Sequence, residues 1–283
     1  MIALTTPTGN IGSKVLVHLL EAGRTDLRVL ARDPGRLPDT ARETVEVVQG
    51  SLDNPADLRG LLEGANSLFW CQPDTPAAPD YVGAYEALAR RGADAIRESG
   101  LSHVVAISAA GEPGTIPAGP ITALHRMENL LAETPASIRF LRCGSFFENL
   151  LWQWDQIVEQ GWFTYPAPGD VPGPQVGTAD IARVAAELLR NPEWVGQEAV
   201  PLLGPTDLTY TQMAEMLSVA IGEPVFYQPS EPDAYGAALQ SLGQSPDAAR
   251  ALIDMFDFLA TSYSPPAADR SLTPLTLTAW LNR

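Results

Sequence analysis

Along the first half of the chain, short apolar runs alternate with longer segments whose apolar residues recur every three or four positions. Runs of the first kind are typical of buried strands, and the second spacing is typical of helices packed on one face. The pattern predicts strands at 2–5, 27–31, 45–49, 67–71, 103–108 and 138–142. It predicts helices at 12–22, 55–62, 80–99 and 121–133, the third of them closed by Gly100. This alternation indicates an α/β fold with a parallel sheet and helices on both faces.

The pattern changes after residue 144, where a mostly helical region is predicted. Four capping signatures predict helices that begin at Thr178, Thr209, Ser245 and Thr273, the last two with proline at the first helical position. Short strands are expected near 200–203 and 225–228. We therefore expect a first domain over 1–144, onto which 175–204 packs back, and a smaller lobe over 145–283.

Composition limits the classes of partner. A chain of 283 residues with 45% hydrophobic residues can hold a main domain and a smaller lobe. The formal net charge of −16 argues against nucleic acid and anionic membranes as partners. Cys71 and Cys143 lie in apolar strand patterns, which favours free thiols, and the three histidines are too scattered to indicate a metal site. Without a recognisable signal peptide or spanning run, a cytoplasmic protein is expected.

The first strand leads into the turn Thr6-Pro7-Thr8-Gly9-Asn10-Ile11-Gly12, which enters a helix directly. Glycines in such a turn let backbone N–H groups and the positive end of the helix face a pyrophosphate. The usual spacing has a third glycine, and Thr6 takes its place here, so a different local backbone is expected. The flanking strands and helix favour a dinucleotide site over a plain turn. Its expected contacts are Thr6, Thr8, Gly9, Asn10, Ile11 and Gly12.

Arg32 stands at the end of the second strand, twenty residues beyond Gly12. An acidic side chain at this place binds the ribose 2′-hydroxyl of NAD, whereas an arginine favours the 2′-phosphate of NADP. Asp33 follows, but its carboxylate can point outward. The alternative for Arg32 is a solvated charge at a strand end. NADPH is therefore the expected cofactor, ahead of NADH.

Further cofactor contacts are expected where the other strands end, because ligands of such sheets collect at the carboxyl ends of the strands. Ser51 and Leu52 are placed at the adenine edge. Gln72, Pro73 and Ser108 are placed at the nicotinamide half. These positions are far apart in the sequence and converge on one edge of the sheet.

A cluster of aromatic residues opens the second half of the chain. Its members are Phe146, Phe147, Trp152, Trp154, Trp162, Phe163 and Tyr165. Large flat side chains can line an apolar substrate cleft beside the nicotinamide, and Phe146, Phe147 and Trp152 are the candidate substrate contacts. A core between the two lobes is the alternative explanation of the cluster.

Several motifs follow one another in a fixed order along the chain. They are Thr8-Gly9-Asn10-Ile11-Gly12, Arg32-Asp33-Pro34, Leu141-Arg142 with Phe146, Glu148 and Asn149, Asp180-Ile181-Ala182, and Thr273-Pro274-Leu275 with Trp280-Leu281. Together they resemble the NmrA-like family of atypical short-chain dehydrogenase/reductases, nearly end to end. The resemblance implies a doubly wound, Rossmann-like domain that binds NAD(P) and a smaller lobe that closes a cleft over the nicotinamide. Within that family the chain looks most similar to bacterial quinone, azo-dye and triphenylmethane reductases.

The catalytic set of ordinary short-chain dehydrogenases is incomplete in this chain. Ser108 stands where their serine does, but no Tyr-x-x-x-Lys pair follows on the next helix. The reductases that the chain resembles carry a histidine four residues before a glutamate. Glu128 fits that glutamate, whereas Leu124 holds the histidine position and His125 comes one place later, about 100° around a helix. Either a locally shifted helix lets His125 act together with Ser108, or the histidine's role is absent.

Hydride addition to a quinone or dye gives a delocalised anion that water can protonate, so binding and orientation can suffice. We therefore expect an NADPH-dependent reductase of a small apolar conjugated acceptor, such as a quinone, a dye or an aromatic ketone. Two alternatives stay open. One is a non-catalytic NADP(H)-binding redox sensor, since the resembled family includes such regulators, and the other is a tailoring reductase for an aromatic metabolite. The sequence leaves open whether the chain forms a homodimer.

Overall fold

The computed structural model describes residues 1–282, and a seven-stranded parallel sheet forms its centre. Its strands are β1 (Ile2–Leu4), β2 (Leu27–Ala31), β3 (Glu46–Gln49), β4 (Ser67–Trp70), β5 (His103–Ala109), β6 (Ser137–Cys143) and β10 (Gln197–Leu202). The strand order is β10-β6-β5-β4-β1-β2-β3, so the direction of winding reverses between β1 and β4. Ligands of open parallel sheets bind at such a switch point, outside the carboxyl ends of the strands.

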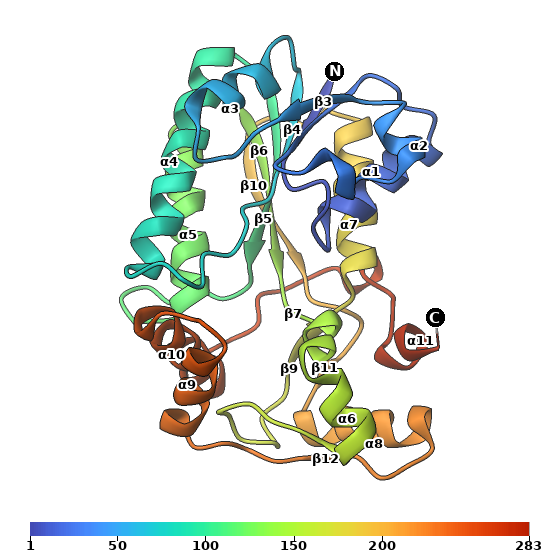
Figure 1. Ribbon diagram of the computed structural model, residues 1–283, viewed down its shortest axis with the longest axis vertical. Coiled ribbons are helices and arrows are strands. Elements are labelled where there is room, and N and C mark those ends of the chain that lie inside the picture. Colours follow the sequence, from blue (N-terminus) through green and yellow to red (C-terminus); the bar gives the residue numbers. More distant parts are fainter. Residues whose placement is uncertain (283) are drawn as a thin grey trace.

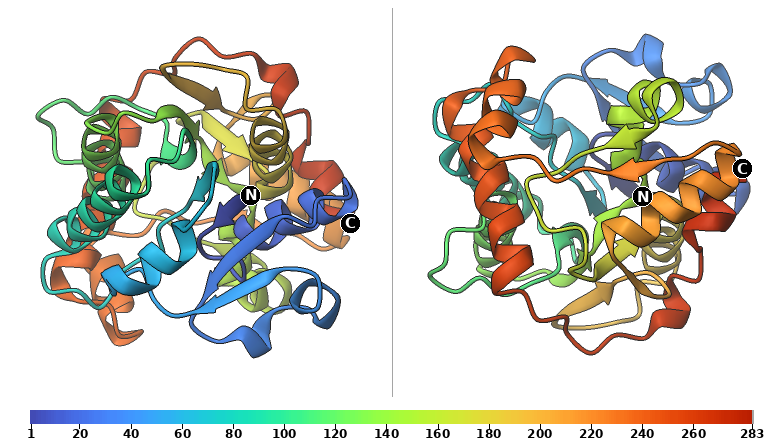
Figure 2. Two further views of the ribbon diagram at one scale, coloured as in Figure 1. Left: turned by 90° about the horizontal axis from the view of Figure 1, so that it is seen from above. Right: turned by 90° about the horizontal axis from the view of Figure 1, so that it is seen from below.

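Helices cover both faces of the sheet (Figure 1). One face carries α1 (Gly12–Glu21), α2 (Asp39–Arg42) and α7 (Thr178–Arg190). The other carries α3 (Pro55–Leu62), α4 (Tyr81–Ser99) and α5 (Gly119–Ala132). Neighbouring strand residues enter different apolar clusters, Phe69 that of α1 and α7 and Leu68 that of α3 to α5, because successive side chains point to opposite faces. Both further views keep the two helix layers apart (Figure 2).

The doubly wound, Rossmann-like fold predicted from the sequence is confirmed. All six predicted strands are present, and each end lies within one residue of its expected place. Gly100 ends α4 with a φ of 65°, in the left-handed conformation expected of a terminating glycine. The strand expected near 200–203 is β10, which pairs with β6 at the edge of the large sheet.

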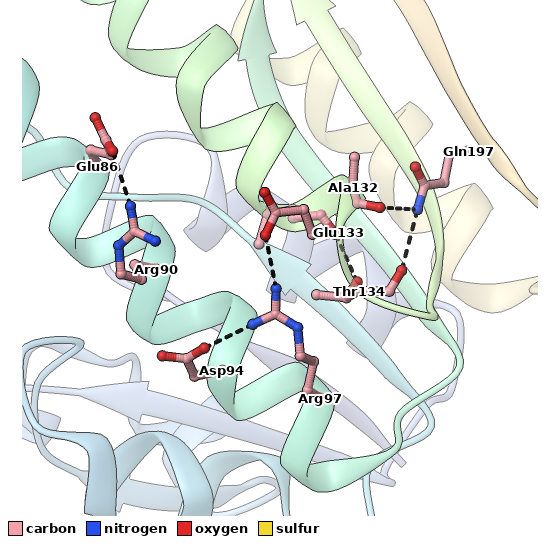
Figure 3. Close-up of polar contacts among 9 residues, drawn as sticks. Glu86, Arg90, Asp94, Arg97, Ala132, Glu133, Thr134 and Gln197 are labelled. Carbon is pink, nitrogen blue, oxygen red and sulfur yellow. Dashed lines mark hydrogen bonds and ion pairs between the residues drawn. The ribbon is translucent and has the colours of Figure 1, made fainter.

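Exposed polar contacts join neighbouring elements at the amino-terminal edge of the sheet (Figure 3). Arg97 of α4 donates hydrogen bonds to Asp94 at 2.8 Å and to Glu133, just beyond α5, at 3.2 Å. The Gln197 side-chain amide of β10 donates to the Ala132 carbonyl oxygen at 3.0 Å. Exposed ion pairs stabilise a fold little, by about 1 kcal/mol at most, so the apolar layers hold these elements together.

The smaller lobe lies where the parallel strands end (Figure 1). β6 passes through Gly144 into its first strand, β7 (Ser145–Phe146). The other elements outside the large sheet are η1 (Pro34–Arg36), η2 (Phe147–Gln153), α6 (Trp154–Gln160), β8 (Trp162–Phe163), β9 (Gly173–Val176), β11 (Asp207–Leu208), α8 (Tyr210–Ile221), β12 (Phe226–Tyr227), α9 (Pro232–Ser241), α10 (Pro246–Thr261), η3 (Arg270–Leu272) and α11 (Leu277–Leu281). η1 follows β2 in the larger part. The core of the lobe is built from η2, α6, β8, β11, α8, β12 and α11, whereas α10 packs against α4 and α5.

One predicted helix start in the lobe is wrong. Thr209 and Ser245 cap α8 and α10 as expected, and the capping box at Thr209 is complete. Thr273 does not begin a helix: its hydroxyl accepts a hydrogen bond from the Gly204 backbone N–H at 2.9 Å. The last helix begins at Leu277, with Thr276 as its N-cap. A tertiary contact thus takes the hydroxyl that a local signal assigned to a cap.

Among residues 1–282, no helix combines the length and apolar character needed to cross a membrane.

Candidate functional site

The turn between β1 and α1 is compact. Thr6 has a φ of 48°, so a threonine adopts the left-handed conformation that glycine reaches most easily. Its hydroxyl donates a hydrogen bond to the Cys71 carbonyl oxygen at 3.2 Å, which ties the turn to the end of β4. A Cβ built on Gly12 would lie 2.2 Å from the Thr6 carbonyl oxygen. Only glycine therefore lets the first turn of α1 pack this closely on the preceding loop.

Backbone amides at the turn are free to bind a ligand. Within the described residues, the N–H groups of Asn10, Ile11 and Gly12 have no protein acceptor. Free amides at the start of a helix, with the positive end of its dipole behind them, form an anion site. Thr8 lies half-buried in the same turn. The turn therefore fits the pyrophosphate of a dinucleotide.

A polar network behind the turn fixes Asn10. The Lys14 ammonium donates hydrogen bonds to the Asn10 carbonyl oxygen at 3.0 Å and to the Thr178 hydroxyl at 2.9 Å. Thr178 donates its hydroxyl in turn to Glu148, at 2.5 Å. Burial lowers the pKa of Lys14, while the nearby Glu148 carboxylate opposes that effect. The network links the turn to α7 and to the start of the smaller lobe.

Arg32 follows β2 as an exposed side chain, and it forms no ion pair or hydrogen bond within residues 1–282. The Asp33 carboxylate accepts a hydrogen bond from the Gly35 N–H at 3.0 Å and so caps η1. The carboxylate that could have bound a ribose hydroxyl is therefore engaged locally. A free guanidinium remains beside the end of β2, as a 2′-phosphate site requires.

Ser51 and Leu52 follow β3 next to β2. The Gly50 N–H donates to the Ala31 carbonyl oxygen at 3.1 Å, and the Ser51 N–H donates to Asp57 at 2.9 Å. The Ser51 hydroxyl bonds Asp53 at 3.1 Å, and Leu52 is buried. This segment presents a fixed backbone and an apolar side chain near Arg32, which suits an adenine edge.

A cavity of about 430 Å³ lies between the sheet and the smaller lobe. Ile11 of the glycine turn lines it, as do Gln72 and Ser108 from the ends of β4 and β5. Pro73 is not among its lining residues. The opposite wall is apolar and comes from the lobe, with Leu208, Leu252, Met255, Phe256 and Leu259 among its members. The cavity thus joins the anion site to an apolar chamber.

Two tyrosines that were not predicted from the sequence as site residues also line the cavity, Tyr81 and Tyr85 of α4. Tyr81 donates its hydroxyl to Asp74 at 2.9 Å, and the Gln72 side chain donates to the Tyr85 carbonyl oxygen at 2.9 Å. Burial raises the pKa of both phenols, and the Asp74 carboxylate raises them further. Both side chains therefore stay uncharged near neutral pH.

Ser108 is held by a buried ion pair. Its hydroxyl donates to Glu128 at 2.5 Å, and both residues are almost fully buried. Arg142 donates to the same carboxylate at 2.7 Å and 3.0 Å, and to Glu112 at 2.9 Å. The hydrogen of Ser108 is thus committed to Glu128, which leaves the lone pairs of its oxygen to accept from a ligand in the cavity.

His125 lies outside this cavity, which corrects its candidate catalytic role. Its Nε2 lies 3.3 Å from the Ala109 carbonyl oxygen, and the ring lines a separate, polar cavity together with Glu112 and Arg126. Leu124 lines the main cavity instead. Because α5 is regular through this position, the one-place offset turns the histidine away from the cleft.

His125→Gln is therefore expected to change kcat/KM for any acceptor by less than about twofold, since His125 does not line the cavity and its ring meets the lining residue Ala109 at the backbone carbonyl oxygen. Leu124→Ala, one position earlier, enlarges the cavity and should raise the KM of the acceptor. Steady-state rates of the two variants measured side by side test this contrast. A His125→Gln rate lowered tenfold or more would return the histidine to the chemistry.

Two of the three aromatic substrate candidates also lie elsewhere. Phe146 lines the cavity. Phe147 is 1% exposed and packs in the core of the lobe, and Trp152 is 88% exposed on the surface of η2. Most of the aromatic cluster thus belongs to the core of the smaller lobe itself, and not to a core between the two lobes as the alternative explanation had it. η2 turns successive side chains in different directions.

Cys71 and Cys143 are free thiols, and both line the cavity. Burial raises the pKa of Cys71 to about 11 and that of Cys143 further. Thiols with such pKa values are protonated near neutral pH, so neither is an activated nucleophile.

Several cavity residues that sequence reasoning missed sit on α10, and others lie within 167–175. Leu252, Met255, Phe256 and Leu259 line the cavity, as does Tyr263 just beyond the helix. Their spacing of three and four is ordinary for a helix packed on a core, so the sequence alone gave no reason to separate a cavity wall from a core.

Comparisons with known proteins find similar NAD(P)H-dependent enzymes. The chain is 28% identical over 263 residues to an NAD(P)H azoreductase of Xenophilus azovorans, covering 93% of this chain and 88% of that protein. The crystal structure of the NADPH-dependent quinone oxidoreductase QOR2 of Escherichia coli, complexed with NADPH, superposes with a TM-score of 0.84 at 26% identity, covering 100% of this chain and 99% of the other.

A triphenylmethane reductase of Citrobacter sp. complexed with NADP(H) shares the fold, with a TM-score of 0.81 at 20% identity, covering 99% of this chain and 98% of the other. The model of a protein family described as NAD(P)H-binding matches residues 7–192, which hold the glycine turn, Arg32 and the Ser108 network. The resemblance to atypical short-chain dehydrogenase/reductases is thus confirmed, and this chain belongs to the NAD(P)H-binding family.

Proposed function

We propose that this protein is an NADPH-dependent reductase that transfers a hydride to an apolar conjugated acceptor such as a quinone. The observation that carries the proposal is the cavity, which begins at the anion site of the glycine turn and ends against the apolar wall of α10. Concave, largely apolar chambers with a few polar groups are typical of sites for small ligands. Relatives named as quinone oxidoreductase and azoreductase support the same class of acceptor.

In this proposal the residues divide the cofactor among them. The free amides of Asn10, Ile11 and Gly12 hold the pyrophosphate, and Arg32 holds the 2′-phosphate. Ser51 and Leu52 border the adenine. Gln72 and Ser108 border the nicotinamide, with Ser108 positioned to accept a hydrogen bond from a carboxamide N–H. The bound cofactor supplies the hydride.

The cavity walls orient an acceptor more than they exchange protons with it. The hydroxyl hydrogens of Ser108 and Tyr81 are already donated to carboxylates. Tyr263 lines the cavity, and its buried hydroxyl has no partner within residues 1–282, so it can donate to a carbonyl oxygen. A quinone accepts a hydride without a dedicated acid, because the charge spreads over the ring.

The free thiols at Cys71 and Cys143 fit a reducing compartment, and we place the protein in the cytoplasm on that ground.

The substrate side of the site is assigned to the lobe over 145–283, and the cofactor side to 1–144 with 175–204.

NADPH fluorescence tests the proposal. Mixing NADPH with the purified protein should enhance its emission, and adding a neutral naphthoquinone should then consume it faster than the protein-free rate. Binding without consumption across a panel of quinones, dyes and aromatic ketones would overturn the reductase and favour the cofactor sensor. If the protein did not bind NADPH, the proposed dinucleotide site would itself be contradicted.

A further inference from the structure

The cavity lining carries a negatively charged side chain and no positively charged one within residues 1–282. Among the described residues that line it there is no lysine, arginine or histidine. Asp74 is its one lining residue that is charged at neutral pH, and it accepts a hydrogen bond from Tyr81 at 2.9 Å. An anionic ligand would therefore leave water without gaining a cation, which is costly in a partly closed site.

The cations just outside the lining are already paired. Arg142, behind Ser108, is bound by Glu128 and Glu112. Arg270, near Tyr263, pairs with Asp207 at 2.8 Å. Neither guanidinium is free to compensate a negative charge brought into the cavity.

The pKa values of the tyrosine side chains that line the cavity also indicate surroundings that disfavour negative charge. Burial raises the pKa of Tyr81, Tyr85 and Tyr210, and it raises that of Tyr263 to about 12. A phenol whose pKa rises on burial resists forming an anion in its surroundings. Negative charge is thus disfavoured on every side of the chamber where a tyrosine lies.

We propose that the cavity selects its acceptor by charge: neutral and cationic conjugated acceptors are reduced in preference to sulfonates and carboxylates, and Asp74 is the residue that favours the cation. This inference rests on the proposed reductase function and narrows its substrate class. It concerns the acceptor only and leaves the cofactor contacts as described.

The chemistry of hydride transfer fits a cationic acceptor in this site. The C–H bond of the dihydronicotinamide breaks, its electron pair leaves with the hydrogen, and a new C–H bond forms on the conjugated cation. The acceptor becomes neutral and the nicotinamide ring becomes cationic, so charge is conserved and no proton is needed. A neutral quinone reduced in the same way gives an anion that takes one proton from water. Either reaction runs without the missing tyrosine and lysine.

Three naphthoquinones that differ only at the end of an ethylene side chain test the proposal: methyl, trimethylammonium and sulfonate. The kcat/KM of the sulfonate should be at least about tenfold below that of the methyl compound, because its charge is desolvated without a partner. The trimethylammonium compound should match or exceed the methyl compound by about threefold, the range of a partly exposed ion pair.

Two variants separate the charge of Asp74 from its hydrogen bond. Asp74→Asn should lower the ratio of ammonium to methyl kcat/KM by about threefold. Tyr81→Phe deletes the same hydrogen bond but keeps the carboxylate, so it should leave that ratio unchanged. An equal fall in both variants would remove the assignment of Asp74.

Equal turnover of the sulfonate and methyl compounds would overturn the charge selection and leave the reductase standing. If none of the three naphthoquinones were reduced, the proposed reductase function would be overturned. In that case calorimetric binding of the corresponding redox-inert naphthalenes to NADPH-loaded protein, whose nicotinamide ring is neutral, still decides the selection, and equal affinities for the three would contradict it.

Discussion

Arg32→Ala is expected to weaken NADPH binding by about 10- to 100-fold, the effect of losing charge-assisted hydrogen bonds to a phosphate. NADH binding should change by less than about twofold, because NADH carries no phosphate for this side chain to bind. Arg32 is exposed and has no partner among residues 1–282, so its removal should leave stability intact. Fluorescence titration of both cofactors against the wild type and the variant measures the ratio.

Arg36 is the matched control. It is exposed like Arg32, lies four residues later in η1 and forms no ion pair within the described chain. Arg36→Ala removes the same charge from the same loop and should alter NADPH binding only slightly. Equal losses for NADPH and NADH in Arg32→Ala would take the residue out of the phosphate site. Equal losses of NADPH affinity in Arg32→Ala and Arg36→Ala would indicate that the positive charge of the loop attracts the cofactor without a direct contact from Arg32.

The larger fold could be predicted because its signals are local and agree with one another. The helix at 55–62 is found at those residues, since Asn54 caps it and proline occupies its first position. The strand at 27–31 is likewise found at its predicted ends, because the charged residues Asp26 and Arg32 flank it. Where propensity, periodicity and capping point the same way, little remains for tertiary contacts to decide.

Single-residue roles were harder to predict because they depend on helical phase. His125 and Leu124 differ by one position, and only the latter lines the main cavity. Thr273 and Thr276 offer similar capping signals, and a contact with Gly204 decides between them. Neither choice is contained in residue type or spacing.

The tyrosines of the cavity were missed for another reason: their setting is assembled from distant segments. The Tyr81 N–H donates to Asp247 of α10 at 2.7 Å, and Ser245 hydrogen-bonds the Ala78 carbonyl oxygen at 2.5 Å. These contacts draw α10 over the start of α4 and make one wall of the two helices. No local pattern announces a contact between residues so far apart in the chain.

Arg142→Met should destabilise the protein by about 3 kcal/mol, because it leaves a buried carboxylate without its counter-charge. Glu128 is 5% exposed and would retain only the Ser108 hydroxyl of the partners described here. The value lies at the low end for a buried pair, since the Arg142 side chain is 20% exposed. Chemical denaturation with the free energy extrapolated to water measures it.

Arg126→Met is the control on the same helix as Glu128. Its guanidinium pairs with Glu86 at 3.3 Å and is 54% exposed, so its loss should cost less than about 0.5 kcal/mol. Glu128→Leu combined with Arg142→Met removes both charges, and this double variant should be more stable than Arg142→Met alone, because no unpaired charge stays buried. If Arg142→Met is no worse than Arg126→Met, the carboxylate does not depend on the guanidinium, and the orientation of Ser108 must have another cause.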